Sequence, residues 1–299
     1  MRIKSFRLTI KQRKKIGGYL FSLPFLIGFL FFFLYPFIQS FIFSLNKLEL
    51  TPSGYLLHFT GLKNYYDAIL VNPEFSRTFV ETIADMAINL PLILTFSFFT
   101  AIILNQEFKG RTLARIIFFL PVIYSAGVVL RLEQTDYITE IMKSSDQAGI
   151  FSSQTLKILF SQIKFLPDTA IQYVLSAIER FAEIIKASGI QILIFLAGLQ
   201  SISPSLYEAA KVEGASGWES FWLITLPMIS PLILTNTVYT IVDTLTVADN
   251  KLVQLIRKTA FLGEGYGMSS AMAIIYFAAI ILLLAIVFKI ISKHIFYHE

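Results

Sequence analysis

Polar side chains at helical spacing interrupt one apolar stretch of this chain, at about residues 227–248. Asn236, Thr240 and Asp243 follow one another at intervals of four and three residues, and Tyr239 lies beside them. Residues three or four apart share one face of a helix, so the three form a polar stripe. Polar groups within membrane spans usually face the bundle interior or a water-filled cavity. The stripe therefore predicts either the lining of a path for a polar solute, with the Tyr239 ring available to stack on a sugar, or hydrogen bonds between helices.

A second row of polar side chains, Glu81, Asp85 and Asn89, repeats at four-residue intervals. Glu81 in this row predicts either contact with a cationic or hydroxyl-rich ligand or contact with lipid headgroups at the outer surface. Gln191 and Gln200, in another apolar stretch, are further candidates for a solute path.

The least apolar part of the second half of the chain reads EAAKVEGASGWESFWLITLP. Pro204, just before it, suits the first position of a helix, and Ser205 and Glu208 have the spacing of a capping box. Gly214 is a natural helix terminator. The sequence therefore predicts a short helix over about residues 204–215.

A second helix should follow, because Ser216 and Glu219 repeat the capping-box spacing, and it should enter the membrane near Leu226 and Pro227. Small residues around the turn would let another surface come close, with Glu208 as a fixed anion; they are Ala209, Ala210, Gly214, Ala215, Ser216 and Gly217. The alternative is a capped connecting loop with no partner.

Residues for covalent, metal or phosphate chemistry are few and scattered. The chain has no Cys, which excludes disulfides, thiolate metal sites and Cys nucleophiles. Its three His are His58, His294 and His298, and the glycines of GEGYGMSS (residues 263–270) lack the lysine of a phosphate-binding loop. We expect no enzymatic activity, no metal site and no cofactor bound by this chain.

The composition is that of an integral membrane protein. Of 299 residues 55% are hydrophobic and only 15% are charged, against about 25% charged in a typical soluble domain. The mean hydropathy is +0.67. In so apolar a chain the net charge of +5 more often sets membrane topology than binds nucleic acid, so lipid is the expected surrounding and no nucleic-acid partner is expected.

Six stretches are long enough to span a bilayer, which takes about 20 apolar residues as a helix. The predicted fold is an all-α integral membrane protein with a single transmembrane domain, residues 17–299, after a tail at 1–16. Pro24 and Pro36 predict a kink in the first span. The spans are expected at about 17–45, 79–104, 113–130, 187–203, 227–248 and 268–291.

The tail carries only basic charges: Arg2, Lys4, Arg7, Lys11, Arg13, Lys14 and Lys15. Basic residues beside spans mark the cytoplasmic side, so both termini and the 204–215 helix are expected on the cytoplasmic side of the cell membrane. The outer side would then hold segments 46–78 and 131–186. Within the latter, apolar spacing over 171–186 indicates an amphipathic helix, either lying on the membrane surface or docking an outside partner.

The segment Glu208-Ala209-Ala210, with Gly214, Ile224 and Leu226-Pro227 at their spacings, resembles the EAA motif of ABC importer permease subunits. FLAGLQSISPSLYEAAKVEGA and NQEFKGRTLARIIFFLP resemble the carbohydrate-importing branch of the type I permeases, relatives of the maltose and glycerol-phosphate permeases. The resemblance implies six spans and a cytoplasmic coupling helix that sits in a cleft of an ATPase subunit. It assigns ATPase coupling to Glu208, which would pair with a basic residue of the ATPase, and to Ala209, Ala210, Gly214 and Ala215.

The same resemblance implies the partners. They are cytoplasmic ATP-binding subunits that hold ATP and Mg²⁺, a second homologous permease subunit (a heterodimer rather than a homodimer), an extracytoplasmic solute-binding protein, and a sugar or oligosaccharide as cargo. Two alternatives stay open: a permease for another polar solute such as glycerol phosphate, or a self-sufficient secondary carrier that uses Glu81, Asp85 and Asp243 for coupling.

Overall fold

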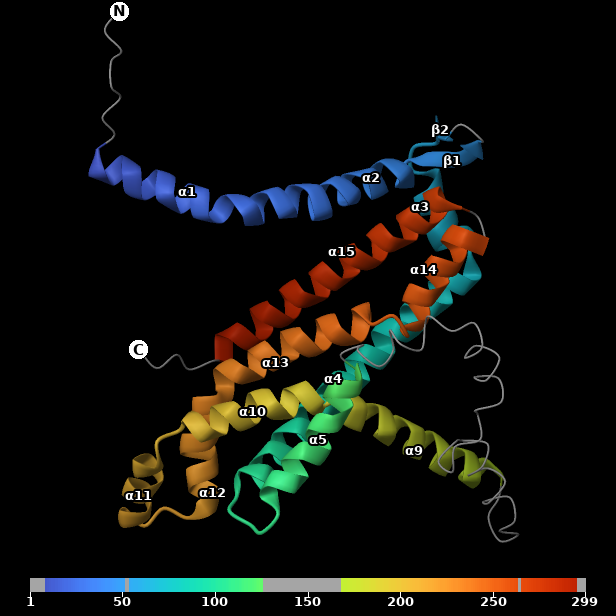
Figure 1. The fold of residues 1–299 in the computed structure, drawn as a ribbon. Coiled ribbons are helices and arrows are strands. Elements are labelled where there is room, and N and C mark those ends of the chain that lie inside the picture. The colour runs from blue at the N-terminus through green and yellow to red at the C-terminus, as the bar shows by residue number, and fades with distance from the viewer. Residues whose placement is uncertain (1–8, 52–53, 126–167, 263–264, 295–299) are drawn as a thin grey trace, which may run out of the picture. The chain divides into compact units, whose positions relative to one another are not determined.

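The structure is a computed structural model that describes residues 9–51, 54–125, 168–262 and 265–294. It is mostly helical (Figure 1). The chain divides into two compact units, one made of residues up to 81 together with 248–279, the other of 82–247 together with residues from 280 onward.

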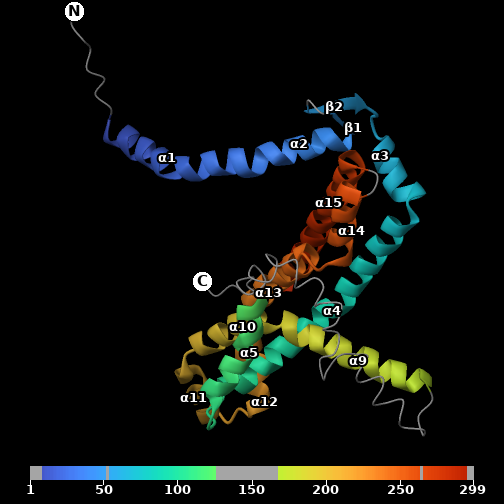
Figure 2. The same ribbon diagram turned by 45° about the vertical axis from the view of Figure 1, so that its right-hand side comes forward.

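The first unit begins with one continuous helical run (Figures 1 and 2). Its elements are α1 (Ile10–Gly28), η1 (Phe29–Leu34), α2 (Tyr35–Ser44), β1 (Asn46–Thr51), β2 (Gly54–Phe59), α3 (Lys63–Tyr66), η2 (Asp67–Val71), the start of α4 (Pro73–Asn105), α14 (Lys251–Leu262) and the start of α15 (Tyr266–Ile291).

Proline explains the irregular turn in the first helical run. The helix continues through Pro24, but the π-helical segment η1 ends one residue before Tyr35 and Pro36. Pro36 has no N–H to give, and its ring would clash with the carbonyl four residues earlier, at Phe32. A wider π turn moves that carbonyl away and lets the helix go on. Pro227 likewise follows a π segment, η3 (Phe221–Thr225).

The structure also contains a β-hairpin. The prediction of an all-α protein is therefore wrong, and the fold is mostly helical. β1 and β2 pair antiparallel, with Leu48 opposite Leu57. The sequence NKLELT alternates polar and apolar residues, which is the two-residue period of a strand. The Asn64 amide nitrogen donates to the carbonyl oxygens of Ser44 (2.8 Å) and Asn46 (3.0 Å), and so fixes the start of the hairpin.

The second unit packs its helices around one apolar core. Its elements are the rest of α4, α5 (Arg111–Ser125), α9 (Asp168–Ala187), α10 (Gly189–Ser201), α11 (Pro204–Val212), α12 (Gly217–Ser220), η3, α13 (Leu226–Thr246), the end of α15 and the short 3₁₀ helix η4 (Ser292–His294). Its core consists of Phe98, Ala101, Leu104, Ile192, Phe195, Leu196, Leu199, Ile202 and Ile229.

Four helical runs in the described residues are long and apolar enough to cross a membrane, and a bent pair makes up to five. The four are Gly17–Ser44, Pro73–Asn105, Gly217–Phe261 and Tyr266–Ile291; the pair is Gln172–Ala187 with Gly189–Ser201, bent by 53°. The span predicted at 113–130 overlaps α5, but residues 126–130 lie outside the described part of the chain, as does most of segment 131–186. The number six therefore stays a prediction.

Candidate functional site

The helix α11 begins at the predicted proline but not with the predicted cap. Pro204 occupies its first turn and Ser203 is the residue before it, with extended backbone. The Ser205–Glu208 capping box is wrong, because Ser205 already lies inside the helix and its hydroxyl pairs with that of Ser203 at 2.8 Å. The Glu208 carboxylate is thus not needed to start the helix, and its side chain is exposed.

The end of α11 is a Schellman turn that needs glycine. The Ala215 N–H donates to the Ala210 carbonyl at 2.9 Å, and the Gly214 N–H donates to the Lys211 carbonyl at 3.1 Å. Gly214 has φ of +85°, where a side chain would be strained. The predicted terminator is confirmed, and two of the small residues assigned to coupling, Ala210 and Ala215, are the ends of this turn.

The helix that follows starts with the predicted capping box. The Ser216 N–H donates to the Glu219 carboxylate at 2.7 Å, and the Glu219 N–H donates to the Ser216 hydroxyl at 3.3 Å. This cap fixes the direction in which the chain enters η3 and α13, because two backbone donors are satisfied at the first turn.

One side of the segment from α11 to η3 is anchored to the core. The hydroxyls of Tyr207 and Thr225 are hydrogen-bonded at 2.9 Å, which joins α11 to η3 across the turn. Tyr207, Phe221 and Ile224 pack against the apolar core, and Ile202 belongs to it. The opposite side, with Glu208, Ala209 and Gly214, is exposed. The segment is a braced helix and turn that presents small side chains and one carboxylate outward.

The two helices that lead into and out of this segment are packed closely. A Cβ on Gly198 of α10 would overlap the Leu232 Cδ1 methyl of α13. Farther along the same pair, the Gln191 amide nitrogen donates to the Thr240 hydroxyl at 3.0 Å, and the Asn236 amide nitrogen donates to the Gln191 carbonyl at 3.3 Å. Glycine at the contact allows this approach.

The polar stripe of α13 therefore has a buried part and an accessible part. Asn236 and Thr240 are completely buried between helices and make the interhelical hydrogen bonds that were one of the two predicted roles. Tyr239 is only partly buried, and Asp243, four residues later on the same helix, is exposed. The Asn236 and Gln191 side-chain oxygens are buried without a hydrogen-bond partner in the described residues.

Two members of the second polar row, Glu81 and Asp85, form ion pairs with arginines. Glu81 accepts from Arg77 one turn earlier at 2.8 Å, and in the second unit Asp85 lies 3.7 Å from Arg180 of α9. The Asn89 side-chain oxygen is buried without a partner among the described residues. No group of three His, Asp or Glu in the described residues is placed to hold a metal ion.

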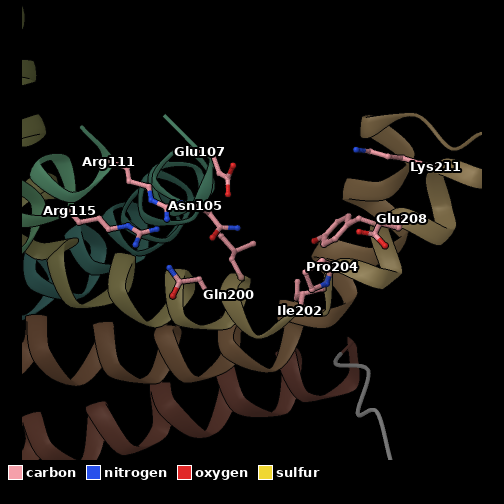
Figure 3. A pocket seen from close by; sticks show the side chains of 11 residues that line it. Asn105, Glu107, Arg111, Arg115, Gln200, Ile202, Pro204, Glu208 and Lys211 are labelled. Atoms are coloured by element: carbon pink, nitrogen blue, oxygen red, sulfur yellow. The ribbon is translucent and has the colours of Figure 1, made fainter. Parts of the chain in front are cut away.

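A polar pocket of about 610 Å³ opens beside α11, and sequence reasoning missed it. Figure 3 shows Arg111, Arg115 and Glu107 on one side of it and Glu208 with Lys211 on the α11 side. The Arg115 guanidinium donates to the Leu104 carbonyl at 2.9 and 3.3 Å, satisfying an acceptor at the end of α4. The sequence singled out Arg111 and Arg115 only as basic residues on the expected cytoplasmic side and as part of the resemblance carried by NQEFKGRTLAR, not as the lining of a pocket.

Comparison with known proteins gives the class. Residues 68–297 match the family described as binding-protein-dependent transport system inner membrane component. Because the match covers well over half of the chain, this protein belongs to that family. It is a multi-pass membrane protein and a transport subunit, not a catalytic enzyme.

Individual relatives confirm the resemblance to ABC importer permeases. The trehalose/maltose transport system permease protein MalF of Thermococcus litoralis is 30% identical over 242 residues, which cover 80% of this chain and 77% of that one. The probable ABC transporter permease protein YesP of Bacillus subtilis is 29% identical over 234 residues, covering 76% and 69%.

Solved structures confirm the fold. A chain of a bacterial ABC transporter involved in the import of the acidic polysaccharide alginate superposes with a TM-score of 0.66 at 19% identity, covering 94% of this chain and 96% of that one. The same kind of transporter, in complex with a periplasmic protein bound to an alginate pentasaccharide, gives a TM-score of 0.62 at 20% identity.

The contact at Gly198 generates a stability prediction. Gly198→Ala should destabilise the protein by about 1–3 kcal/mol, because the new methyl group overlaps Leu232 in a packed site. The thermal unfolding midpoint in detergent measures the loss. In the double variant Gly198→Ala/Leu232→Ala the overlap is gone, so the two losses should be less than additive. Strict additivity would mean that the two helices do not touch at this point.

Proposed function

We propose that this chain is the transmembrane subunit of an ATP-driven importer and forms the pathway for a sugar or oligosaccharide. Six spans, cytoplasmic termini and a cytoplasmic coupling helix at about 204–215 belong to the proposal. The observation that carries it is the braced segment from α11 to η3: anchored on one side by Tyr207, and exposed on the other at Glu208 and Ala209. A surface connecting loop would need no such bracing.

The proposed mechanism follows from that bracing. A cleft in an ATP-binding subunit would receive the small side chains of α11 and its turn, and Glu208 would pair with a basic residue there. Small residues allow close packing, and close packing transmits displacement with little slack. Since α11 is fixed to η3 through Tyr207 and Thr225, a push on α11 would also move α13. ATP and Mg²⁺ would be held by the partner chain.

A carbohydrate cargo is supported by the relatives. Their names include a trehalose/maltose, a lactose and an arabinooligosaccharide permease. A second candidate is a phosphorylated polyol, since the sn-glycerol-3-phosphate permease protein UgpA of Brucella abortus is 36% identical over 120 residues, covering 35% of this chain. Of the proposed path residues Asn236, Tyr239, Thr240 and Asp243, we assign solute contact to the accessible Tyr239 and Asp243 and helix positioning to the buried pair.

Partners complete the proposal. The run Gly17–Ser44 has no buried residue in its most apolar part, so lipid and a second, homologous permease subunit would cover it. An extracytoplasmic solute-binding protein would deliver the cargo, as in the solved alginate complex. A self-sufficient carrier is a weaker account, because Glu81 and Asp85 already have arginine partners.

Coupling is tested by substitutions on the exposed side of the segment. Glu208→Lys replaces the carboxylate of the proposed ion pair with a positive charge. Gly214→Val puts a β-branched residue where the turn needs a φ of +85°, so the turn is strained. Both should insert into the membrane normally and lose most ATP-driven uptake in vesicles, while the assembled complex still hydrolyses ATP. Glu213→Lys, exposed on the same turn, is the matched control. Wild-type uptake by Glu208→Lys would refute the coupling assignment.

The solute path is tested separately by Asp243→Asn and Tyr239→Phe. Asp243→Asn removes the charge of an accessible carboxylate and Tyr239→Phe removes a hydroxyl, so the apparent KM for uptake should rise several-fold while the ATPase still binds. Asp249→Asn, an exposed aspartate beyond the end of α13, serves as the control. Unchanged uptake and unchanged specificity in both variants would remove Tyr239 and Asp243 from the path.

A further inference from the structure

The pocket beside α11 contains charged side chains that do not pair with one another. Glu107 and Arg111 come from the turn between α4 and α5 and from the start of α5, whereas Glu208 and Lys211 come from α11 (Figure 3). All four are exposed, and none of them forms an ion pair with another described residue. Two acidic and two basic side chains thus line one pocket without forming ion pairs among the described residues.

Arg115 gives this pocket a fixed cationic wall. Its guanidinium is half-buried and is held by two hydrogen bonds to the Leu104 carbonyl, so its position is set before any partner arrives. A preorganised group loses less entropy when it binds. Behind it the pocket floor is Leu199 and the buried Ile202, which are part of the apolar core. The pocket is therefore a rigid feature of the second unit.

The mixture of charges decides what kind of partner fits. A phosphate, a nucleotide or an anionic lipid headgroup would be attracted by Arg111, Arg115 and Lys211 but repelled by Glu107 and Glu208 on the same pocket walls. A protein segment can carry both signs and satisfy both sets of groups, which also discriminates against wrong partners.

We propose that the groove between the α4–α5 turn and α11 is a second docking surface for the ATP-binding subunit, which inserts a segment with a carboxylate toward Arg111 and Arg115 and a basic side chain toward Glu107 and Glu208. The inference rests on the proposed function, because α11 forms one wall of the groove. It extends the contact from the exposed side of α11 to the loop before α5.

The test uses charge reversal in the full-length permease, held in nanodiscs, and the affinity of the ATP-binding subunit that copurifies with it. Arg111→Glu should weaken binding by about tenfold or more, with a weaker dependence on salt than the wild type. The control Lys109→Glu makes the same charge change two residues away, outside the groove, and should alter binding by less than about twofold. Arg111→Gln only removes the charge, so its loss of binding should lie between the losses for Lys109→Glu and Arg111→Glu.

Three outcomes distinguish failure of the groove proposal from failure of the proposed coupling. If Glu208→Lys weakens binding and Arg111→Glu does not, the groove is not a docking surface, although coupling through α11 stands. If Lys109→Glu weakens binding as much as Arg111→Glu, the effect is one of general surface charge and the groove is again refuted. If neither Glu208→Lys nor Arg111→Glu weakens binding, the groove is refuted, and the uptake measured with Glu208→Lys decides the proposed coupling on its own. An unchanged thermal midpoint shows that Arg111→Glu remains folded.

Discussion

The close contact of α10 with α13 is the constraint on which the rest of the second unit depends. Gly198 lets the helices approach until only the Leu232 methyl separates them, and the hydrogen bonds of Gln191 and Asn236 hold the pair farther along. At the other end, the Tyr207–Thr225 hydrogen bond closes the loop between them. The segment from α11 to η3 thus lies between two helices that are held together at three places: Gly198–Leu232, Gln191–Thr240–Asn236 and Tyr207–Thr225.

This fastening also explains why costly polar side chains occur inside apolar helices. An isolated amide in hydrocarbon costs free energy, but an amide that bonds across helices specifies which faces meet. With dispersion alone, several packings of α10 against α13 would have similar free energies, because lipid tails are as apolar as leucine. Gln191, Asn236 and Thr240 select one packing, while Tyr239 and Asp243 take no part in it and stay accessible.

Local features of the segment could be predicted from sequence, because neighbours in the chain decide them. Pro204, the glycine turn at Gly214 and the capping box of Ser216 with Glu219 depend on a few adjacent residues, and the structure has all three. The Ser205–Glu208 box had the right spacing but failed, since the proline had already set the helix start one residue earlier.

Tertiary relations were beyond prediction from one sequence. Spacing placed Asn236 and Thr240 on one face but could not show that Gln191 of α10 faces them. The hairpin of β1 and β2 was not predicted, because only NKLELT alternates polar and apolar residues, whereas its partner strand GYLLHF does not. The charged groove joins residues about a hundred positions apart, and no local pattern in α5 or α11 indicates that Arg111 and Glu208 line one hollow.

Coupling as proposed requires that the segment from α11 to η3 and α13 move together when the ATPase acts. Because the chain has no native Cys, spin labels can be attached to single cysteines at the exposed positions Val212 on α11 and Thr246 at the end of α13. Distances between the labels would be measured by pulsed electron paramagnetic resonance in the assembled transporter, without nucleotide and trapped with ATP. We expect the same distance distribution in both states. A shift between the states would show that α11 moves independently of α13 and would refute the proposed coupling.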